Sequence, residues 1–136
     1  METTLAFLTP EEIAALLAAA PSKVCDAGDV IVAQNATLRQ IFVIDRGSVG
    51  IERENGAQTV DLAILGKGEF FGEISFIDGA PTSARVVARE PTEVKVLTPE
   101  LVAGMDQTEP TFGARFYRSL AAILAERLRK TSLNVW

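Results

Sequence analysis

A glycine-rich stretch near the middle of the chain holds the residue types best suited to ligand chemistry. Gly68–Ala84 reads GEFFGEISFIDGAPTSA, in which Gly72 precedes Glu73 and the hydroxyl residues Thr82 and Ser83 follow. A glycine lets the backbone approach a ligand and adopt unusual dihedral angles. A short helix that begins after it points N–H groups at an anion. The stretch therefore indicates an anion-binding turn.

Catalytic and metal chemistry lack the residues they usually require. The chain contains no histidine, which is the usual proton shuttle and a common metal ligand. Glu69 and Glu73 lie four residues apart, but no third group supports a metal or acid–base role. We expect no enzyme activity, no catalytic residue, no metal site and no cofactor.

The charge balance argues against a nucleic-acid partner. The chain has 13 Lys and Arg against 18 Asp and Glu, a net charge of −5, whereas binding to a phosphate backbone rests on a basic surface. One basic cluster lies near the C-terminus, at a spacing typical of a solvated helix face. Its members are Arg115, Arg118, Arg127, Arg129 and Lys130.

The chain has no features of an exported or membrane protein. Its first residues, METTLAFLTPEE, are acidic and lack a basic leader, and the apolar run IAALLAAA is too short to span a membrane. The single cysteine, Cys25, allows no internal disulfide and favours a buried or edge position. We expect a cytoplasmic protein with no membrane partner.

The elements that must position the glycine-rich stretch are mostly short strands. An initial helix is predicted from the capping pattern Thr9-Pro10-Glu11-Glu12 and ends at Pro21. Between residues 24 and 98, short apolar runs alternate with turn signals, and Asn55-Gly56 is a strong hairpin signal. This pattern favours an antiparallel jelly-roll β-barrel, mainly β with flanking helices.

Helical signals return after the barrel. Thr98-Pro99-Glu100 predicts a helix over residues 99–107, and a second helix is expected over residues 110–131. Phe112, Phe116, Leu120, Leu124 and Leu128 form an apolar stripe along the second helix. No internal repeat or linker interrupts the chain, so residues 1–136 are interpreted as one domain.

Taken together, these segments resemble the cyclic-nucleotide-binding domain family, the sensor domain of catabolite-activator-type regulators and of cyclic-nucleotide-regulated kinases and channels. The resemblance covers nearly the whole chain. It is carried in order by LTPEEIAALLAAA, AGDVIVAQN, IFVIDRGSVGI, LGKGEFFGEISFIDGAPTSARVVA, TEVKVLTPELV and ILAERLR. It implies a regulatory module that binds cyclic AMP, cyclic GMP or a related anionic nucleotide in the barrel and signals through its C-terminal helix.

The resemblance also implies which residues bind the ligand. In the family, a glutamate at the position of Glu73 accepts a hydrogen bond from the ribose 2′-hydroxyl, and an arginine nine residues later pairs with the cyclic phosphate. That position holds Thr82 here, which has neither the charge nor the fork of a guanidinium. The implied ligand-binding residues are Gly72, Glu73, Ile74, Ser75, Thr82, Ser83, Ala84 and Arg127.

Two of these residues, Glu73 and Arg127, are equally suited to purely structural roles. Glu73 is also suited to capping its own helix turn or to pairing with an arginine, and Arg127 to lying in solvent on a helix face. Arg85 is close in sequence to Thr82, but strand alternation places its side chain on the opposite face.

The departure at Thr82 leaves several functions open. The chain is interpreted as a nucleotide sensor, as a degenerate fold that docks a protein or forms a homodimer through its C-terminal helix without nucleotide, or as the sensor part of a transcription regulator. Family regulators carry a DNA-reading domain after the long helix, where this chain ends at Trp136. We therefore expect a stand-alone domain or a piece of a longer protein.

Overall fold

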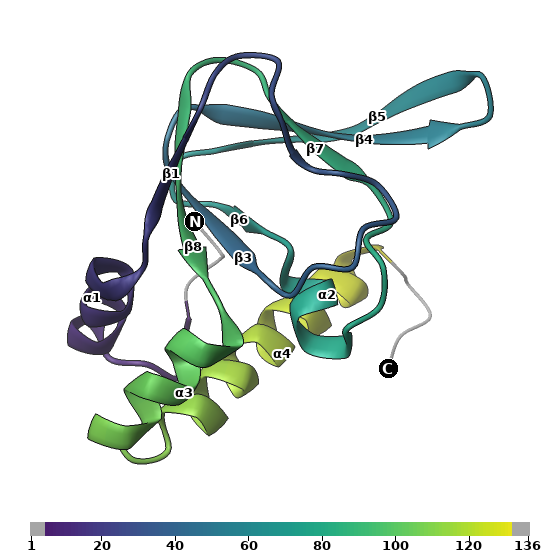
Figure 1. Cartoon of the computed structure of the whole chain (residues 1–136). Helices are drawn as coiled ribbons and strands as arrows, with labels where there is room; N and C mark the ends of the chain where they lie inside the picture. Colours follow the sequence, from purple (N-terminus) through teal and green to yellow (C-terminus); the bar gives the residue numbers. More distant parts are fainter. Residues whose placement is uncertain (1–4, 132–136) are drawn as a thin grey trace. The chain divides into compact units, whose positions relative to one another are not determined.

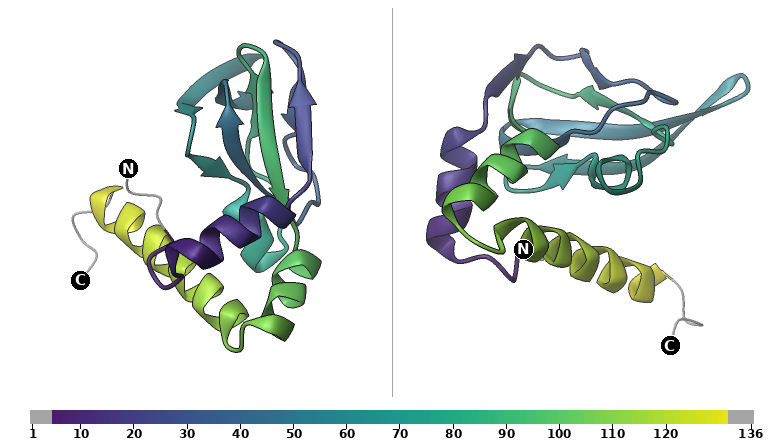
Figure 2. Two further views of the ribbon diagram at one scale, coloured as in Figure 1. Left: turned by 90° about the vertical axis from the view of Figure 1, so that its left-hand side faces the viewer. Right: turned by 60° about the horizontal axis from the view of Figure 1, so that its bottom comes forward.

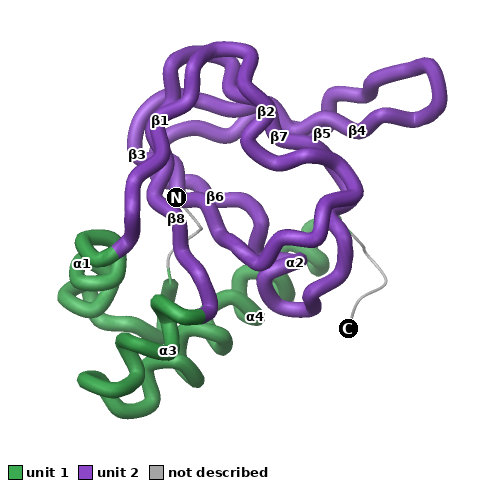
Figure 3. The backbone as a smooth tube through the Cα atoms, in the orientation of Figure 1, with its two compact units in different colours: residues 1–19, 100–136 green, residues 20–99 purple. Residues whose placement is uncertain are grey.

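A computed structural model describes residues 5–131, and these divide into two compact units (Figure 3). One unit, the barrel unit, comprises residues 20–99. The other, the helical unit, comprises the described residues before 20 and after 99.

The barrel unit consists of two four-stranded sheets (Figure 1). One sheet has the strand order β1-β8-β3-β6 and the other has the order β2-β7-β4-β5, and every described pairing is antiparallel. The strands are β1 (Ser22–Cys25), β2 (Val30–Val32), β3 (Ile41–Arg46), β4 (Ser48–Asn55), β5 (Gln58–Gly66), β6 (Phe70–Phe71), β7 (Arg85–Ala88) and β8 (Thr92–Leu97). The antiparallel, mainly β fold with flanking helices is confirmed, and the first strand begins at residue 22, two residues earlier than expected.

Apolar side chains at alternate strand positions form the barrel core, as a two-residue period requires. Val94 and Val49 are fully buried, one from each sheet. Cys25 belongs to the same core, where burial raises the pKa of its thiol. The expected buried position of this cysteine is thus confirmed.

The longest hairpin joins β4 and β5 through the expected Asn55-Gly56 turn, where Gly56 has a φ of 68°. Figure 1 shows this hairpin projecting beyond the other strands of the barrel. Most of β5 is exposed, including Val60, Leu62 and Ile64. The outer part of the hairpin therefore adds little to the core.

The helical unit contains α1 (Pro10–Ala19), α3 (Pro99–Thr108) except its first residue, and α4 (Phe112–Thr131). The expected start of the last helix at Pro110 is wrong. Thr111 has a φ of 67°, outside the helical region, and its carbonyl accepts the first turn's bond from the Arg115 N–H. Figure 2 shows α4 as one continuous helix. Within residues 5–131, no helix has the length and apolarity to cross a membrane.

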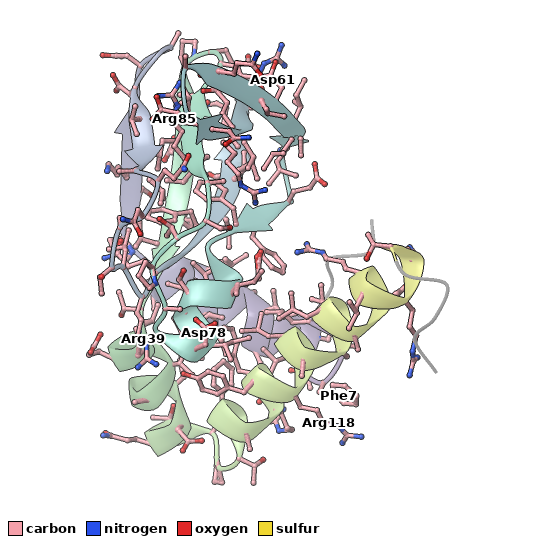
Figure 4. All side chains as sticks on the ribbon, turned by 90° about the vertical axis from the view of Figure 1, so that its right-hand side faces the viewer. Phe7, Arg39, Asp61, Asp78, Arg85 and Arg118 are labelled. Carbon is pink, nitrogen blue, oxygen red and sulfur yellow. The ribbon has the colours of Figure 1, made fainter. Side chains whose placement is uncertain are left out.

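An ion pair links the start of α1 to α4. The predicted capping box is present, because the Thr9 hydroxyl accepts from the Glu12 N–H at 3.1 Å and the Glu12 carboxylate accepts from the Thr9 N–H at 2.9 Å. Both Glu12 oxygens also accept from Arg115, each at 2.7 Å. Nearby, the Arg118 guanidinium lies 4.0 Å from the centre of the Phe7 ring (Figure 4). Glu12 thus stabilises both the start of α1 and the attachment of α1 to α4.

This contact predicts an acid-sensitive helical unit. Hydrogen bonds from Arg115 and the Thr9 N–H lower the pKa of Glu12 from 4.5 to about 2. A lowered pKa means that the stabilisation is present above pH 4.5 and is lost as the pH falls toward 2. We expect Glu12→Gln to lower the melting temperature by several degrees at pH 6 and hardly at all near pH 2.

Glu11→Gln, at the exposed neighbouring position of the same turn, is the matched control. Thermal unfolding followed by circular dichroism between pH 2 and pH 6 measures both variants. A Glu12→Gln deficit that stays constant over this range would contradict the assignment.

Candidate functional site

The glycine-rich stretch folds as a strand, a tight turn and a short helix. In β6, Phe71 pairs with Phe42 of β3, and their rings stack with centroids 5.1 Å apart. Gly72 follows with a φ of 92°, and α2 spans Glu73–Asp78. Gly79 ends α2 with a φ of 70°, where its N–H donates to the Ser75 carbonyl. The anion-binding turn predicted from the sequence therefore has the expected local shape.

The turn at position 72 also requires glycine because there is no room for a Cβ atom. A Cβ atom at this position would collide with the backbone carbonyl oxygen of Gln40. A positive φ already disfavours any other residue. Gly72 thus lets β6 and α2 lie directly against the chain before β3.

A cavity of about 120 Å³ opens between α2 and the inner faces of four strands, β2, β4, β6 and β7. Seven of the eight implied ligand-binding residues line it: Gly72, Glu73, Ile74, Ser75, Thr82, Ser83 and Ala84. We call it the cassette cavity. Small-molecule sites usually measure about 300–1,000 Å³. The cassette cavity therefore encloses part of a nucleotide-sized ligand, and the rest would extend beyond its walls.

Residues that the sequence analysis did not assign to the site complete the walls. They are Val32, Ile51, Phe71 and Val86. They come from β2, β4, β6 and β7, at positions that face the barrel interior. Their signal in the sequence was the alternating apolar pattern, which marks core and cavity wall alike.

Glu73 places a carboxylate in this apolar setting. The residue is only 7% exposed and is the first residue of α2. Ser75, also 7% exposed, lies in the same turn. A buried carboxylate that lines a cavity can accept hydrogen bonds from a polar ligand.

Thr82 has a structural role that the sequence did not reveal. Its hydroxyl donates to the Ala33 carbonyl at 2.6 Å and accepts from the Ala36 N–H at 2.9 Å. Its backbone N–H donates to the Ala36 carbonyl, and its carbonyl accepts from the Asn35 N–H. Thr82 therefore ties the loop over residues 33–36 to the edge of the cassette cavity.

Comparison with known proteins agrees with this geometry. The profile of the cyclic nucleotide-binding domain matches residues 22–108, more than half of the chain. The chain belongs to the cyclic nucleotide-binding domain family. This confirms the resemblance noted from the sequence.

Three relatives show how far the similarity extends. The cyclic AMP receptor protein of Thermus thermophilus is 33% identical over 94% of this chain and 58% of its own length. The crystal structure of the Thermus thermophilus catabolite activator protein superposes with a TM-score of 0.82 at 33% identity, covering 96% of this chain and 61% of that one. Glutaminase 2 of Bradyrhizobium diazoefficiens is 32% identical over 98% of this chain but only 21% of its own length. The chain thus covers less than two thirds of the length of the cyclic AMP receptor protein and of glutaminase 2.

The arginine after the cassette faces away from the cavity, as expected. Arg85 Nε donates to Glu52 at 2.8 Å, and its Nη1 lies 3.5 Å from Glu54. The Glu52 hydrogen bond raises the pKa of Arg85. Glu52 follows Ile51, which lines the cavity, and Glu52 is paired with Arg85 across β4 and β7. Glu52 and Arg85 therefore share the outer face of the sheet.

A second hollow, of about 470 Å³, lies on this outer face. Its walls come from β4, β5 and β7 and the residue after β7: Gly50, Glu52, Asp61, Leu62, Ala63, Ile64, Val87 and Arg89. None of the implied ligand-binding residues is among its lining residues. We call it the outer-face hollow.

Arg127, the eighth implied residue, belongs to α4 in the helical unit and is not among the residues that line the cassette cavity. Its contact with a ligand stays a prediction from the family resemblance.

The two hydroxyl bonds of Thr82 predict a measurable stabilisation. Thr82→Val keeps the shape of the side chain but removes both bonds, so we expect the free energy of unfolding to fall by about 1–2 kcal/mol. Thr59→Val, at an exposed position of β5, is the matched control. Urea unfolding followed by circular dichroism compares the two variants. Equal losses in the free energy of unfolding would mean that the two hydroxyl hydrogen bonds of Thr82 do not stabilise the fold.

Proposed function

We propose that this chain is a regulatory sensor module that binds a cyclic nucleotide in the cassette cavity and has no catalytic activity of its own. The observation that carries the proposal is the convergence of Gly72, Glu73, Ser83 and Ala84 on one cavity. The resemblance to the family implies that residues at these positions bind the nucleotide.

Each of these residues has a role suited to its place. Glu73 would accept a hydrogen bond from the ribose 2′-hydroxyl, since its buried carboxylate lines the cavity. Ser83 and the Ala84 N–H would bind the phosphate, since both residues line the same cavity. Gly72 gives the ligand access to the backbone.

The names of two relatives suggest which nucleotides to test. One is called a cyclic AMP receptor protein, and another, from Dictyostelium discoideum, is called cyclic GMP-binding protein C. The second is 28% identical over 90% of this chain. We therefore propose cyclic AMP and cyclic GMP as the first ligands to compare.

We further propose that ligand binding acts through α4, whose Arg127 would contact the bound nucleotide. In this account the chain is the sensor part of a regulator, alone or within a longer protein. Its acidic charge disfavours direct binding to nucleic acid. The cytoplasmic location expected from the sequence stays a prediction.

Thermal unfolding tests the proposal directly. A ligand that binds only the native state must stabilise it, by about 2.7 kcal/mol when its concentration is 100 times the dissociation constant. We expect cyclic AMP or cyclic GMP at 1 mM to raise the melting temperature by several degrees. Glu73→Gln should abolish most of that rise.

Glu100→Gln, in the exposed first turn of α3, is the matched control and should keep the full rise. If neither nucleotide raises the melting temperature of the natural sequence, the sensor proposal fails. If Glu73→Gln retains the rise, the ligand binds elsewhere.

A second candidate function is a docking or homodimerisation module that uses no nucleotide. Two observations favour it. The Thr82 hydroxyl is used within the fold, and the apolar stripe of α4 ends at Leu128, which is 55% exposed. Light scattering at high protein concentration tests self-association. A dimer mass that is lost in Leu128→Glu would support this candidate, and a monomer mass would oppose it.

A further inference from the structure

We propose that Arg53 supplies the positive charge missing at Thr82 and binds the phosphate of the nucleotide at the rim of the cassette cavity. The inference rests on the proposed function, because it concerns the same ligand and the same cavity. Arg53, which is not among the implied ligand-binding residues, would then determine specificity for a phosphate-bearing ligand.

The position of Arg53 on β4 directs it to this rim. Ile51 lines the cavity, and Arg53 lies two residues further along the same strand, on the same face of the sheet. Its Nε–H donates to the Ser83 carbonyl at 3.1 Å. Since Ser83 lines the cavity, the guanidinium is anchored beside the residues expected to bind the phosphate.

The remaining donors of Arg53 are available to a ligand. Within residues 5–131, the bond to Ser83 is the only hydrogen bond of the Arg53 side chain, and no ion pair involves its guanidinium. A guanidinium presents its donors in a planar fork that matches the oxygens of a phosphate. Because the Ser83 carbonyl already holds Nε in place, the side chain loses less conformational entropy when its two terminal nitrogens bind an anion.

Neighbouring arginines are less suited to this role. Arg85 is paired with Glu52 and Glu54 on the outer face of the sheet. The guanidinium of Arg39 lies against Gly79, at the end of α2 opposite to Gly72. Figure 4 shows Arg39 near Asp78 and distant from Arg85. Arg53 thus combines a bond to a cavity residue with an unpaired charge.

Calorimetric titration of Arg53 variants with cyclic AMP and cyclic GMP tests the inference. We expect Arg53→Gln to lower the affinity about tenfold, the effect of losing one charge-assisted hydrogen bond. Arg53→Lys should retain an intermediate affinity, because it keeps the charge but not the fork. Adenosine, which lacks the phosphate, should bind the natural sequence and Arg53→Gln equally.

Arg46→Gln is the matched control, because Arg46 is an exposed arginine of the other sheet that pairs with Glu93. Its affinity should equal that of the natural sequence, and the unliganded melting temperatures of all variants should agree within a few degrees. Raising the salt concentration should weaken nucleotide binding less in Arg53→Gln than in the natural sequence.

The outcomes separate the inference from the function on which it rests. If the natural sequence binds cyclic nucleotide and Arg53→Gln binds it equally well, the role of Arg53 is wrong and the sensor function stands. If the natural sequence binds neither nucleotide, both are wrong. A loss in Arg53→Gln that also appears with adenosine would mean that Arg53 shapes the cavity and does not bind the phosphate.

Discussion

Gly72→Ala should unfold the cassette turn and abolish nucleotide binding. The new methyl group would sit at a φ of 92° and collide with the Gln40 carbonyl oxygen, which is backbone and cannot rotate away. The backbone strain alone costs about 1–3 kcal/mol, and relieving the collision requires β6 or the chain before β3 to move. We expect the free energy of unfolding to fall by at least about 3 kcal/mol.

Gly28→Ala provides a control at a glycine with the same φ. Gly28 also has a φ of 92°, but a Cβ atom there would meet no heavy atom within 4 Å. This variant should lose only the strain energy and should bind nucleotide normally. Chemical denaturation measures the free energy of unfolding of both variants. Equal losses would show that the collision of the new Cβ with the Gln40 carbonyl oxygen does not destabilise the protein.

Phe42→Ala should be the second most damaging change. Phe42 is 2% exposed and stacks on Phe71, itself 3% exposed, with an angle of 15° between the rings. Replacing a buried phenylalanine by alanine typically costs about 3–5 kcal/mol, because it removes apolar contacts and leaves a cavity. The melting temperature should fall by about 10 °C or more.

This change should also weaken the ligand site, because Phe71 lines the cassette cavity and would lose its stacking partner. Phe42→Leu keeps most of the volume and should cost less than half as much. Thermal unfolding of the two variants compares them. A Phe42→Leu loss as large as that of Phe42→Ala would mean that ring stacking, and not volume, holds the core.

Local signals in the sequence predicted the local structure well. The capping residues Thr9 and Glu12 form the expected hydrogen bonds, and Asn55-Gly56 forms the expected hairpin turn. The family pattern identified seven of the residues that line the cassette cavity, because all seven lie in one stretch of the chain, residues 72–84. The start of α4 was missed because the backbone of Thr111 adopts a positive φ, which residue type does not predict.

Long-range contacts could not be read from the sequence. The hydroxyl of Thr82 bonds to residues 46 and 49 positions away, and Arg53 bonds to Ser83 across 30 positions. Such pairs depend on the register between strands and on the path of the loops. The interpretation of residues 1–136 as one domain stays a prediction, since the described chain divides into two compact units.

The most direct test of the sensor account is to map where a nucleotide binds. Titration of ¹⁵N-labelled protein with cyclic AMP or cyclic GMP, followed by two-dimensional NMR, reports on each backbone amide. We expect the largest shifts at the amides of Gly72, Glu73, Ser75, Ser83 and Ala84, which line the cassette cavity. Unchanged spectra at millimolar nucleotide, or largest shifts in residues 61–64 of the outer-face hollow, would contradict the sensor account.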